Sequence, residues 1–292
     1  MKKLLLLFLL AFLAVPIASA EESVVTLTTT LDEGASIKLY TWADSMDDAF
    51  TIDWGDGVEK IYNKVKPSWT YGSEITGKLG ASKTITIKGD ITYLEIKEMQ
   101  ISAATFANTK LKEVDMEKNQ LTDFNLSGLP EVTKLSLNEN SIVTFSSTGN
   151  SVLKNLGLKS NKIDSHQFEI SSLANSLEQL NVSENGENFV ALNLINFDKL
   201  QYFTANDNPE LTTVVFYDGS TNLKQISMNN CHIMHFYAIS LPNLSSLNLS
   251  NNALLDFENG TYPNLSTLSV NGNYLSEIDV TKFPKLFSFD CS

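Results

Sequence analysis

The sequence predicts a mostly β protein, in which a solenoid of parallel strands follows a small antiparallel β module. Three observations lead to this fold class. An eleven-residue phrase recurs through residues 91–292, and short runs of alternating apolar and polar residues fill residues 21–90. Proline often stands just before a new phrase, where it disfavours a helix. The prediction therefore places a β-rich cap domain at 21–90 and a repeat domain at 91–292.

The recurring phrase is L-x-x-L-x-L-x-x-N-x-L, as in "LKEVDMEKNQL" and "LSSLNLSNNAL". Its L-x-L core is a short strand with both leucines on one side, and stacking one strand per repeat buries those leucines in a parallel sheet. This is the signature of the leucine-rich repeat. We expect about nine repeats and a truncated last one, "LFSFDCS". The copies begin between 20 and 24 residues apart, at Ile91, Leu111, Val132, Leu153, Leu177, Leu200, Leu223, Leu244, Leu265 and Leu286.

The asparagine of the phrase falls where the chain turns out of the strand. Its amide can both donate and accept, so a column of asparagines can pair backbone groups that the turn leaves open. We interpret this column as a structural ladder. Its members are Asn119, Asn140, Asn161, Asn185, Asn208, Cys231, Asn252 and Asn273.

The segment that returns to the next strand is expected to be extended or a short 3₁₀ turn on the convex side. Proline precedes four strands by two residues, at Pro130, Pro242, Pro263 and Pro284. A second apolar column predicts a packed spine along this side. It comprises Phe124, Phe145, Phe168, Phe236, Phe257 and Ile278.

Residues 21–90 predict short antiparallel strands arranged like a β-sandwich, which would cap the first repeat. In "FTIDWGDGVEKIY", Phe50, Ile52 and Trp54 share one face, and Asp-Gly supplies the turn into the next strand. This stretch resembles the W-x-F-G-D-G neighbourhood of PKD-type β-sandwich domains. Calcium is the alternative role of its carboxylates, although no twelve-residue calcium loop is present. The candidate ligands are Asp53 and Asp56, with Asp44, Asp47 and Asp48 nearby.

The first twenty residues, "MKKLLLLFLLAFLAVPIASA", read as a secretory signal peptide removed after Ala20. We therefore expect a protein that is secreted or held at a bacterial cell surface, without a transmembrane segment. All 21 basic residues are lysine, and the net charge is −13. A nucleic-acid partner is excluded on this ground, since such binding needs basic patches.

The segment "CHIMH" at residues 231–235 has the letters of a metal site but not the geometry. In the repeat register, Cys231 occupies the asparagine column, His232 points outward and His235 precedes Phe236. These side chains diverge, whereas a tetrahedral zinc site needs them to converge. No metal and no cofactor is therefore predicted. Cys231 and Cys291 lie three repeats apart, roughly 14 Å, too far for a disulfide, so both are expected to be free and buried.

The sequence predicts no enzyme, because it contains no catalytic motif. Glu95 should lie beside Asp115 on the neighbouring strand, but an open, wet sheet face should give little desolvation to separate the pKa values of such carboxylates. A hydrolytic enzyme is the least favoured hypothesis.

The outward positions between the leucines form one continuous sheet face, which is the candidate binding surface. It is charged at its N-terminal end and becomes small, polar and neutral farther along. The candidate residues are Tyr93, Glu95, Glu113, Asp115, Glu117, Lys134, Asn181, Tyr202, Asn206, Ser227, Asn229, Asn248 and Asn271.

The repeat domain as a whole resembles secreted bacterial leucine-rich-repeat proteins of the broadly internalin-like kind. The resemblance implies a non-enzymatic recognition or adhesion protein that binds a protein or a glycan through this face. The alternative is a structural spacer within a longer surface protein. The sequence stops partway through a repeat at "FPKLFSFDCS", which leaves open end-to-end self-association at the last coil.

Overall fold

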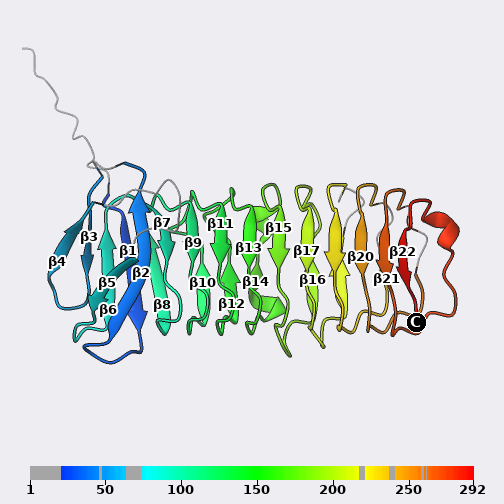
Figure 1. The fold of residues 1–292 in the computed structure, drawn as a ribbon, viewed down its shortest axis with the longest axis horizontal. Coiled ribbons are helices and arrows are strands. Elements are labelled where there is room, and N and C mark those ends of the chain that lie inside the picture. Colours follow the sequence, from blue (N-terminus) through cyan, green and yellow to red (C-terminus); the bar gives the residue numbers. More distant parts are fainter. Residues whose placement is uncertain are drawn as a thin grey trace, which may run out of the picture.

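The computed structural model describes residues 21–45, 48–63, 74–216, 221–236, 241–257, 260 and 262–292. The predicted signal peptide and Asp47 lie outside these residues. The molecule is a stack of β coils closed at its N-terminal end by an antiparallel β cap (Figure 1). This is the predicted fold class.

One face of the stack is a twelve-stranded sheet, called the main sheet from here on. It receives one strand from each repeat, and these strands pair in parallel, while two cap strands, β2 (Ser36–Ala43) and β5 (Glu74–Lys78), extend it in antiparallel fashion. The repeat strands are β7 (Ile91–Glu95), β9 (Glu113–Asp115), β11 (Lys134–Ser136), β13 (Asn155–Gly157), β15 (Gln179–Asn181), β17 (Tyr202–Thr204), β19 (Gln225–Ser227), β20 (Ser246–Asn248), β21 (Thr267–Ser269) and β22 (Ser288–Asp290).

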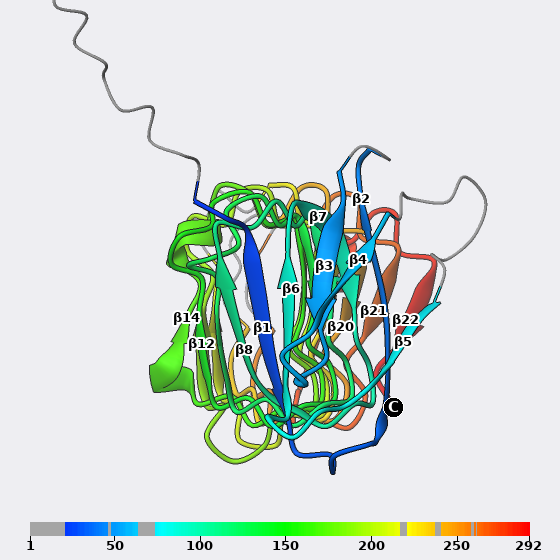
Figure 2. The ribbon, with the colours of Figure 1, turned by 90° about the vertical axis from the view of Figure 1, so that its left-hand side faces the viewer.

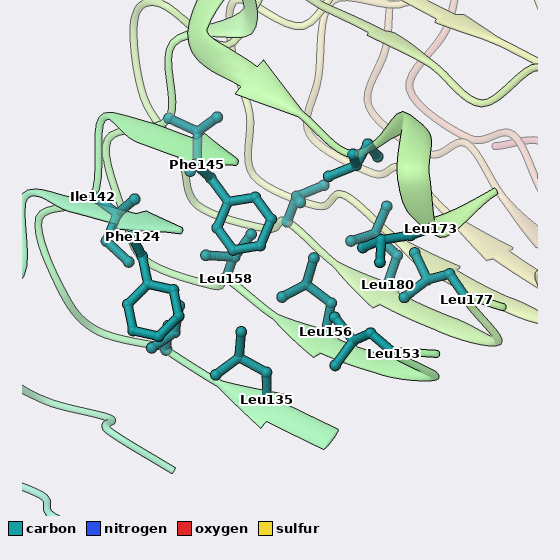
Figure 3. Close-up of a cluster of buried hydrophobic side chains, with 14 of the residues drawn as sticks. Phe124, Leu135, Ile142, Phe145, Leu153, Leu156, Leu158, Leu173, Leu177 and Leu180 are labelled. Atoms are coloured by element: carbon teal, nitrogen blue, oxygen red, sulfur yellow. The ribbon is translucent and has the colours of Figure 1, made fainter. Parts of the chain in front are cut away.

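The register of the main sheet stacks equivalent residues of the repeat on one another. Val114 pairs with Leu135, and Leu135 with Leu156, and all three are buried. Phe124 and Phe145 point toward Leu135 and Leu156 from the opposite side of the coil (Figure 3). Each coil alone would expose this apolar side, so the core exists only because the coils stack.

The opposite side of the stack, called the return side from here on, carries short strands and 3₁₀ turns, as predicted. Its strands form a three-stranded sheet, β10-β12-β14, and a two-stranded one, β16-β18. These elements are β10 (Asp123–Asn125), β12 (Thr144–Ser146), β14 (Phe168–Glu169), β16 (Ala191–Asn193) and β18 (Thr213–Val215), with η1 (Ser165–Gln167), η2 (Ser171–Leu173) and η3 (Val280–Lys282).

The predicted apolar spine lies beneath the return side as a row of aromatic contacts. Phe145 lies 5.8 Å from Phe168, and Phe236 lies 6.1 Å from Phe257, between ring centroids. The row also includes rings that the sequence pattern did not assign to it, among them Phe189 and Phe216. These rings lie in the longer repeats, where the spacing to the next strand differs from that of the regular copies.

The turn after each main-sheet strand uses a left-handed backbone conformation. Lys118 has φ of 57° and Glu139 has φ of 55°, values uncommon for residues other than glycine. The same conformation recurs immediately before the ladder position of every repeat from Asn119 to Asn273. Such turns leave backbone groups without secondary-structure partners, and the ladder side chain lies directly beside them.

Each ladder asparagine joins two coils. Asn140 Nδ2 donates to the carbonyl of Met116 in the preceding coil at 2.9 Å and to Leu137 in its own coil at 3.0 Å. Its Oδ1 accepts from the amide of Leu121 at 3.1 Å. The same pattern recurs from Asn119 to Asn273, except that Asn208 Oδ1 accepts from the amide of Asn185.

The cap is a five-stranded antiparallel sheet that faces the cap end of the main sheet (Figure 2). Its order is β4-β3-β6-β1-β8, and between the two sheets lie buried residues such as Leu27, Leu39, Ile52 and Trp54. Strand pairing crosses residue 90, because β2 pairs with β7 of the first coil. The five strands of the cap sheet are β1 (Val24–Thr29), β3 (Phe50–Asp53), β4 (Glu59–Tyr62), β6 (Thr84–Lys88) and β8 (Ile101–Ala107).

The carboxylates of the W-G-D-G stretch form the turn between β3 and β4. Asp53 Oδ1 accepts from the amides of Gly55 at 2.8 Å and Gly57 at 3.0 Å, and Asp56 Oδ1 accepts from Val58 at 3.1 Å. Asp44 instead lies against Lys112, at 2.5 Å between Oδ2 and Nζ.

Candidate binding surface on the main sheet

The outward positions of the main sheet bring the predicted candidate residues onto one face. Glu95 lies beside Asp115, and Asp115 beside Ser136, in the parallel register. Along the interior strands of the sheet, their side chains alternate with buried apolar residues. Most are half-buried, because each is flanked by its neighbours on the adjacent coils.

The charged N-terminal part of this face is an internally paired network. Lys97 Nζ lies 2.6 Å from Asp115 Oδ2 and 3.4 Å from Glu117 Oε2. Glu117 Oε1 also accepts hydrogen bonds from Ser136 Oγ at 2.5 Å and Asn138 Nδ2 at 2.7 Å. These polar groups are therefore engaged with one another across three coils.

The expectation that an open sheet face leaves carboxylate pKa values unseparated was wrong. Only 24% of the Asp115 side chain and 25% of the Glu117 side chain is exposed. Burial raises the pKa of Asp115 above its ordinary value. Burial alone would raise the pKa of Glu117 as well, but the hydrogen bonds from Ser136 and Asn138 and the Lys97 charge lower it instead. The strand pattern alone predicts that water reaches this face freely. Neighbouring side chains exclude part of that water from Asp115 and Glu117.

Tyr93 is covered by a cap residue. The Trp42 ring of β2 stacks on Tyr93 with centroids 3.8 Å apart and planes 5° from parallel. Tyr93 Oη donates to Glu95 Oε2 at 2.5 Å, and burial raises the Tyr93 pKa. Sequence reasoning missed Trp42, because only the pairing of β2 with β7 places it beside the first repeat.

A shallow depression lies in the middle of the face, where Gly157 provides no side chain. Its volume is about 320 Å³. The side chains of Asn155 and Gln179 line it and form no hydrogen bonds within the described residues. Tyr202 is 36% exposed at its edge, with Lys224 Nζ 5.9 Å from the ring centroid. Gln179 was not among the predicted candidates, and its outward strand position was the signal that could have identified it.

The C-terminal part of the face is polar, and several of its side chains bond to one another. Ser227 Oγ donates to Asn206 Oδ1 at 2.8 Å, and Asn206 Oδ1 also accepts from the amide of Asn229 at 3.1 Å. Asn248 Oδ1 accepts from the amide of Ser250 at 3.0 Å. These residues form a polar surface on the C-terminal part of the stack.

The "CHIMH" residues occupy separate environments. Cys231 Sγ donates to the carbonyl of Ala205 at 3.1 Å from the ladder position, and burial raises its pKa to about 11. His232 is exposed, and His235 Nδ1 lies 3.2 Å from Asp256 Oδ1. No cluster of three metal-ligating side chains occurs among the described residues.

The prediction of two free, buried cysteines was only partly right. Both are free, but Cys231 is half-buried and Cys291 is exposed. Cys291 follows β22, and no further strand of the described chain covers that coil.

The fold and this face together define a leucine-rich-repeat solenoid with an N-terminal β cap. Within the described residues, no helix has the length and apolar character needed to cross a membrane. Neither a protein-family model nor a curated protein sequence matches the chain.

Several solved structures of leucine-rich-repeat proteins are similar to the chain, and they include bacterial ones. The functional domain of InlJ from Listeria monocytogenes, which includes a cysteine ladder, is 22% identical with a TM-score of 0.62. That similarity covers 73% of this chain and 47% of the InlJ domain, so the chain spans about half of its length.

Two further structures are more distant. The internalin InlF from Listeria monocytogenes strain 4b F2365 is 20% identical, with a TM-score of 0.44 over 69% of this chain and 67% of InlF. YopM from Yersinia enterocolitica WA-314 is 18% identical, with a TM-score of 0.41 over 69% of this chain and 55% of YopM.

Proposed function

We propose that the protein is a non-enzymatic recognition protein, which binds a protein or a glycan through the outward face of the main sheet. The observation that carries this proposal is the depression around Gly157. Amide side chains without partners in the described chain line it, and an exposed tyrosine stands at its edge. Free amides supply hydrogen-bond donors and acceptors, and tyrosine is a frequent contributor to binding energy.

The remaining parts of the prediction are kept as proposals. Residues 1–20 would direct export to the exterior or the cell surface, and residues 21–90 would act as the cap domain of the repeats at 91–292. The sequence of residues 1–20 and the resemblance to secreted internalin-like proteins support a surface role.

Binding measurements with the mature chain test the site. The chain is applied to a glycan array and to immobilised cell-surface proteins, and each ligand found is measured again with Tyr202→Ala and Gln179→Arg. We expect both variants to weaken binding at least about tenfold, the effect of losing a central contact worth some 1.4 kcal/mol. Ser276→Arg, which adds the same charge at an exposed position outside this face, should bind as the parent does.

Charge reversal at the N-terminal end of the face is a less specific test of the binding site. Asp115 and Glu117 are bonded to Lys97, Ser136 and Asn138, so their reversal would disturb the fold along with any binding. Glu113→Lys is the better variant, because the Glu113 side chain is 42% exposed and its only ion pair within the described residues, to Lys134, is long at 3.8 Å. Equal binding by Tyr202→Ala, Gln179→Arg and the parent would place the ligand outside this depression, whereas the absence of any ligand in both screens would favour the spacer role.

A further inference from the structure

A second cleft lies on the return side, away from the proposed binding face. It has a volume of about 600 Å³, within the range of ligand-binding clefts. One wall is formed by η1, β14 and η2, and the floor by the outward residues of β16 and β18.

The cleft arises from the longest repeat. The copies at Leu153 and Leu177 begin 24 residues apart (177 − 153), whereas regular copies are 21 residues long. This longer repeat contains the two 3₁₀ turns that flank β14, and together these elements project from the return side (Figure 2). Ser165 Oγ links this repeat to the next one, because it accepts hydrogen bonds from the amides of Val190 at 2.9 Å and Ala191 at 3.1 Å.

This projection interrupts the pairing of the return strands. The sheet β10-β12-β14 ends at β14, and the next sheet begins at β16, so no ladder joins these two strands of adjacent coils. β14 therefore presents an open strand edge to the cleft. An open edge can pair with an added strand, whose backbone supplies the missing hydrogen bonds.

The floor beside this edge is apolar and partly exposed. Ile195 is 37% exposed and Val215 is 39% exposed, over the buried side chains of Ile170 and Leu192. Alternate side chains of a strand laid along β14 would face this floor, and the others would face solvent. The floor thus favours an occupant in which apolar and polar residues alternate.

The rim of the cleft carries negative charge. Glu169 Oε1 accepts from the amide of Ser171 at 2.6 Å. Hydrogen bonds from the Ser171 side chain and then from its amide lower the Glu169 pKa, so the carboxylate is ionised at neutral pH. No lysine is among the residues that line the cleft. A cationic side chain on the occupant would complement this rim.

We propose that this cleft binds an extended peptide segment of a partner protein, which adds a parallel strand to the open edge of β14. Its apolar side chains lie on Ile195 and Val215, and a lysine or arginine faces Glu169. The site is independent of the main-sheet face, so the protein can hold two ligands on opposite sides.

Selection from a displayed hexapeptide library against the immobilised mature chain tests the proposal. We expect enrichment of peptides in which apolar and polar residues alternate around a basic residue. A selected peptide should bind the Ile195→Asp variant at least about tenfold more weakly, because an apolar contact of about 1.5 kcal/mol or more is lost. Val152→Asp is the matched control: Val152 is 40% exposed outside the cleft, and this variant should bind normally.

Backbone methylation separates strand addition from contact by side chains alone. N-methylation of the alternate amides that face β14 should abolish binding, and methylation of the intervening amides should leave it unchanged. A library that yields no peptide, a peptide bound equally by Ile195→Asp and Val152→Asp, or indifference to both methylation patterns would overturn the proposal. Tyr202→Ala should not affect the peptide, and loss of binding in that variant would place the peptide on the main sheet instead.

Discussion

Single side chains decide how firmly neighbouring coils are joined. The amide of Asn140 contacts backbone groups of three segments, whereas the thiol of Cys231 donates chiefly to Ala205. A thiol is a weak donor and a weak acceptor, so one rung of the ladder is poorer than the others.

Replacing this thiol by an amide should improve the rung. We expect Cys231→Asn to be neutral or to raise the free energy of unfolding by about 1 kcal/mol, the usual net contribution of a hydrogen bond. Urea unfolding of the two proteins measures the difference. Asn185→Ala is the opposing control and should destabilise, because the carbonyls of Leu158 and Val182 lose their donor. A clear loss of stability in Cys231→Asn would show that residue 231 does not occupy the ladder position.

The two central carboxylates should affect stability in opposite ways. The folded-state pKa of Glu117 lies below its ordinary 4.5, so its contribution is present above that pH and is lost as pH falls through the folded value. The folded-state pKa of Asp115 lies above its ordinary 3.8, so its contribution is present at lower pH and is lost as pH rises through the folded value.

At pH 7, therefore, Glu117→Gln should lower the free energy of unfolding more than Asp115→Asn does. The deficit of Glu117→Gln should shrink as the pH falls below 4.5. Thermal unfolding of both variants across this range checks the order, and a larger loss in Asp115→Asn at pH 7 would contradict it.

Residue by residue, the sequence predicted what depends on the repeat and missed what depends on contacts between segments. The ladder and the buried leucines follow from spacing alone. The cover of Trp42 over Tyr93 and the exclusion of water around Asp115 depend on strands that are remote in sequence. No local pattern encodes such contacts.

At the scale of elements, the cap depends on close packing between its five-stranded sheet and the end of the main sheet formed by β2 and β5. Gly77 of β5 lies directly against the indole of Trp54, which is fully buried, and a Cβ at this position would overlap the ring. We expect Gly77→Ala to destabilise the protein by about 1–3 kcal/mol, the usual cost of overpacking a core. The neighbouring Thr76→Ala, at an exposed position of β5, should change stability little. Thermal melts of both variants measure the contrast.

The return-side elements were predictable in kind but not in placement. Proline and the short return segments predicted extended or 3₁₀ structure, which the molecule has. The 24-residue spacing was visible too, but the outward displacement of β14 was not. Extra residues can be accommodated in several ways, and the choice depends on contacts such as that of Ser165 with Val190 and Ala191.

For the whole molecule, the continuous main sheet predicts that the cap and the first coils unfold together. The chain's three tryptophans all lie within residues 42–69, so tryptophan fluorescence reports on the cap. Far-ultraviolet circular dichroism reports on the whole solenoid. We expect the two urea transitions to coincide, because β2 pairs directly with β7. Separate transitions would instead support a cap that folds independently up to the boundary proposed at residue 90.

The joint between the coils that begin at Leu200 and Leu223 combines two weaknesses. In this joint the ladder position is occupied by the thiol of Cys231. On the return side, β18 is the last strand of the β16-β18 sheet, so no return-side ladder crosses this joint within the described residues. The joint at β14 lacks a return-side ladder too, but it keeps the full amide of Asn185. A force applied along the stack would therefore separate the interior coils first at Cys231. We expect this joint to be the mechanically weakest interior joint of the described solenoid.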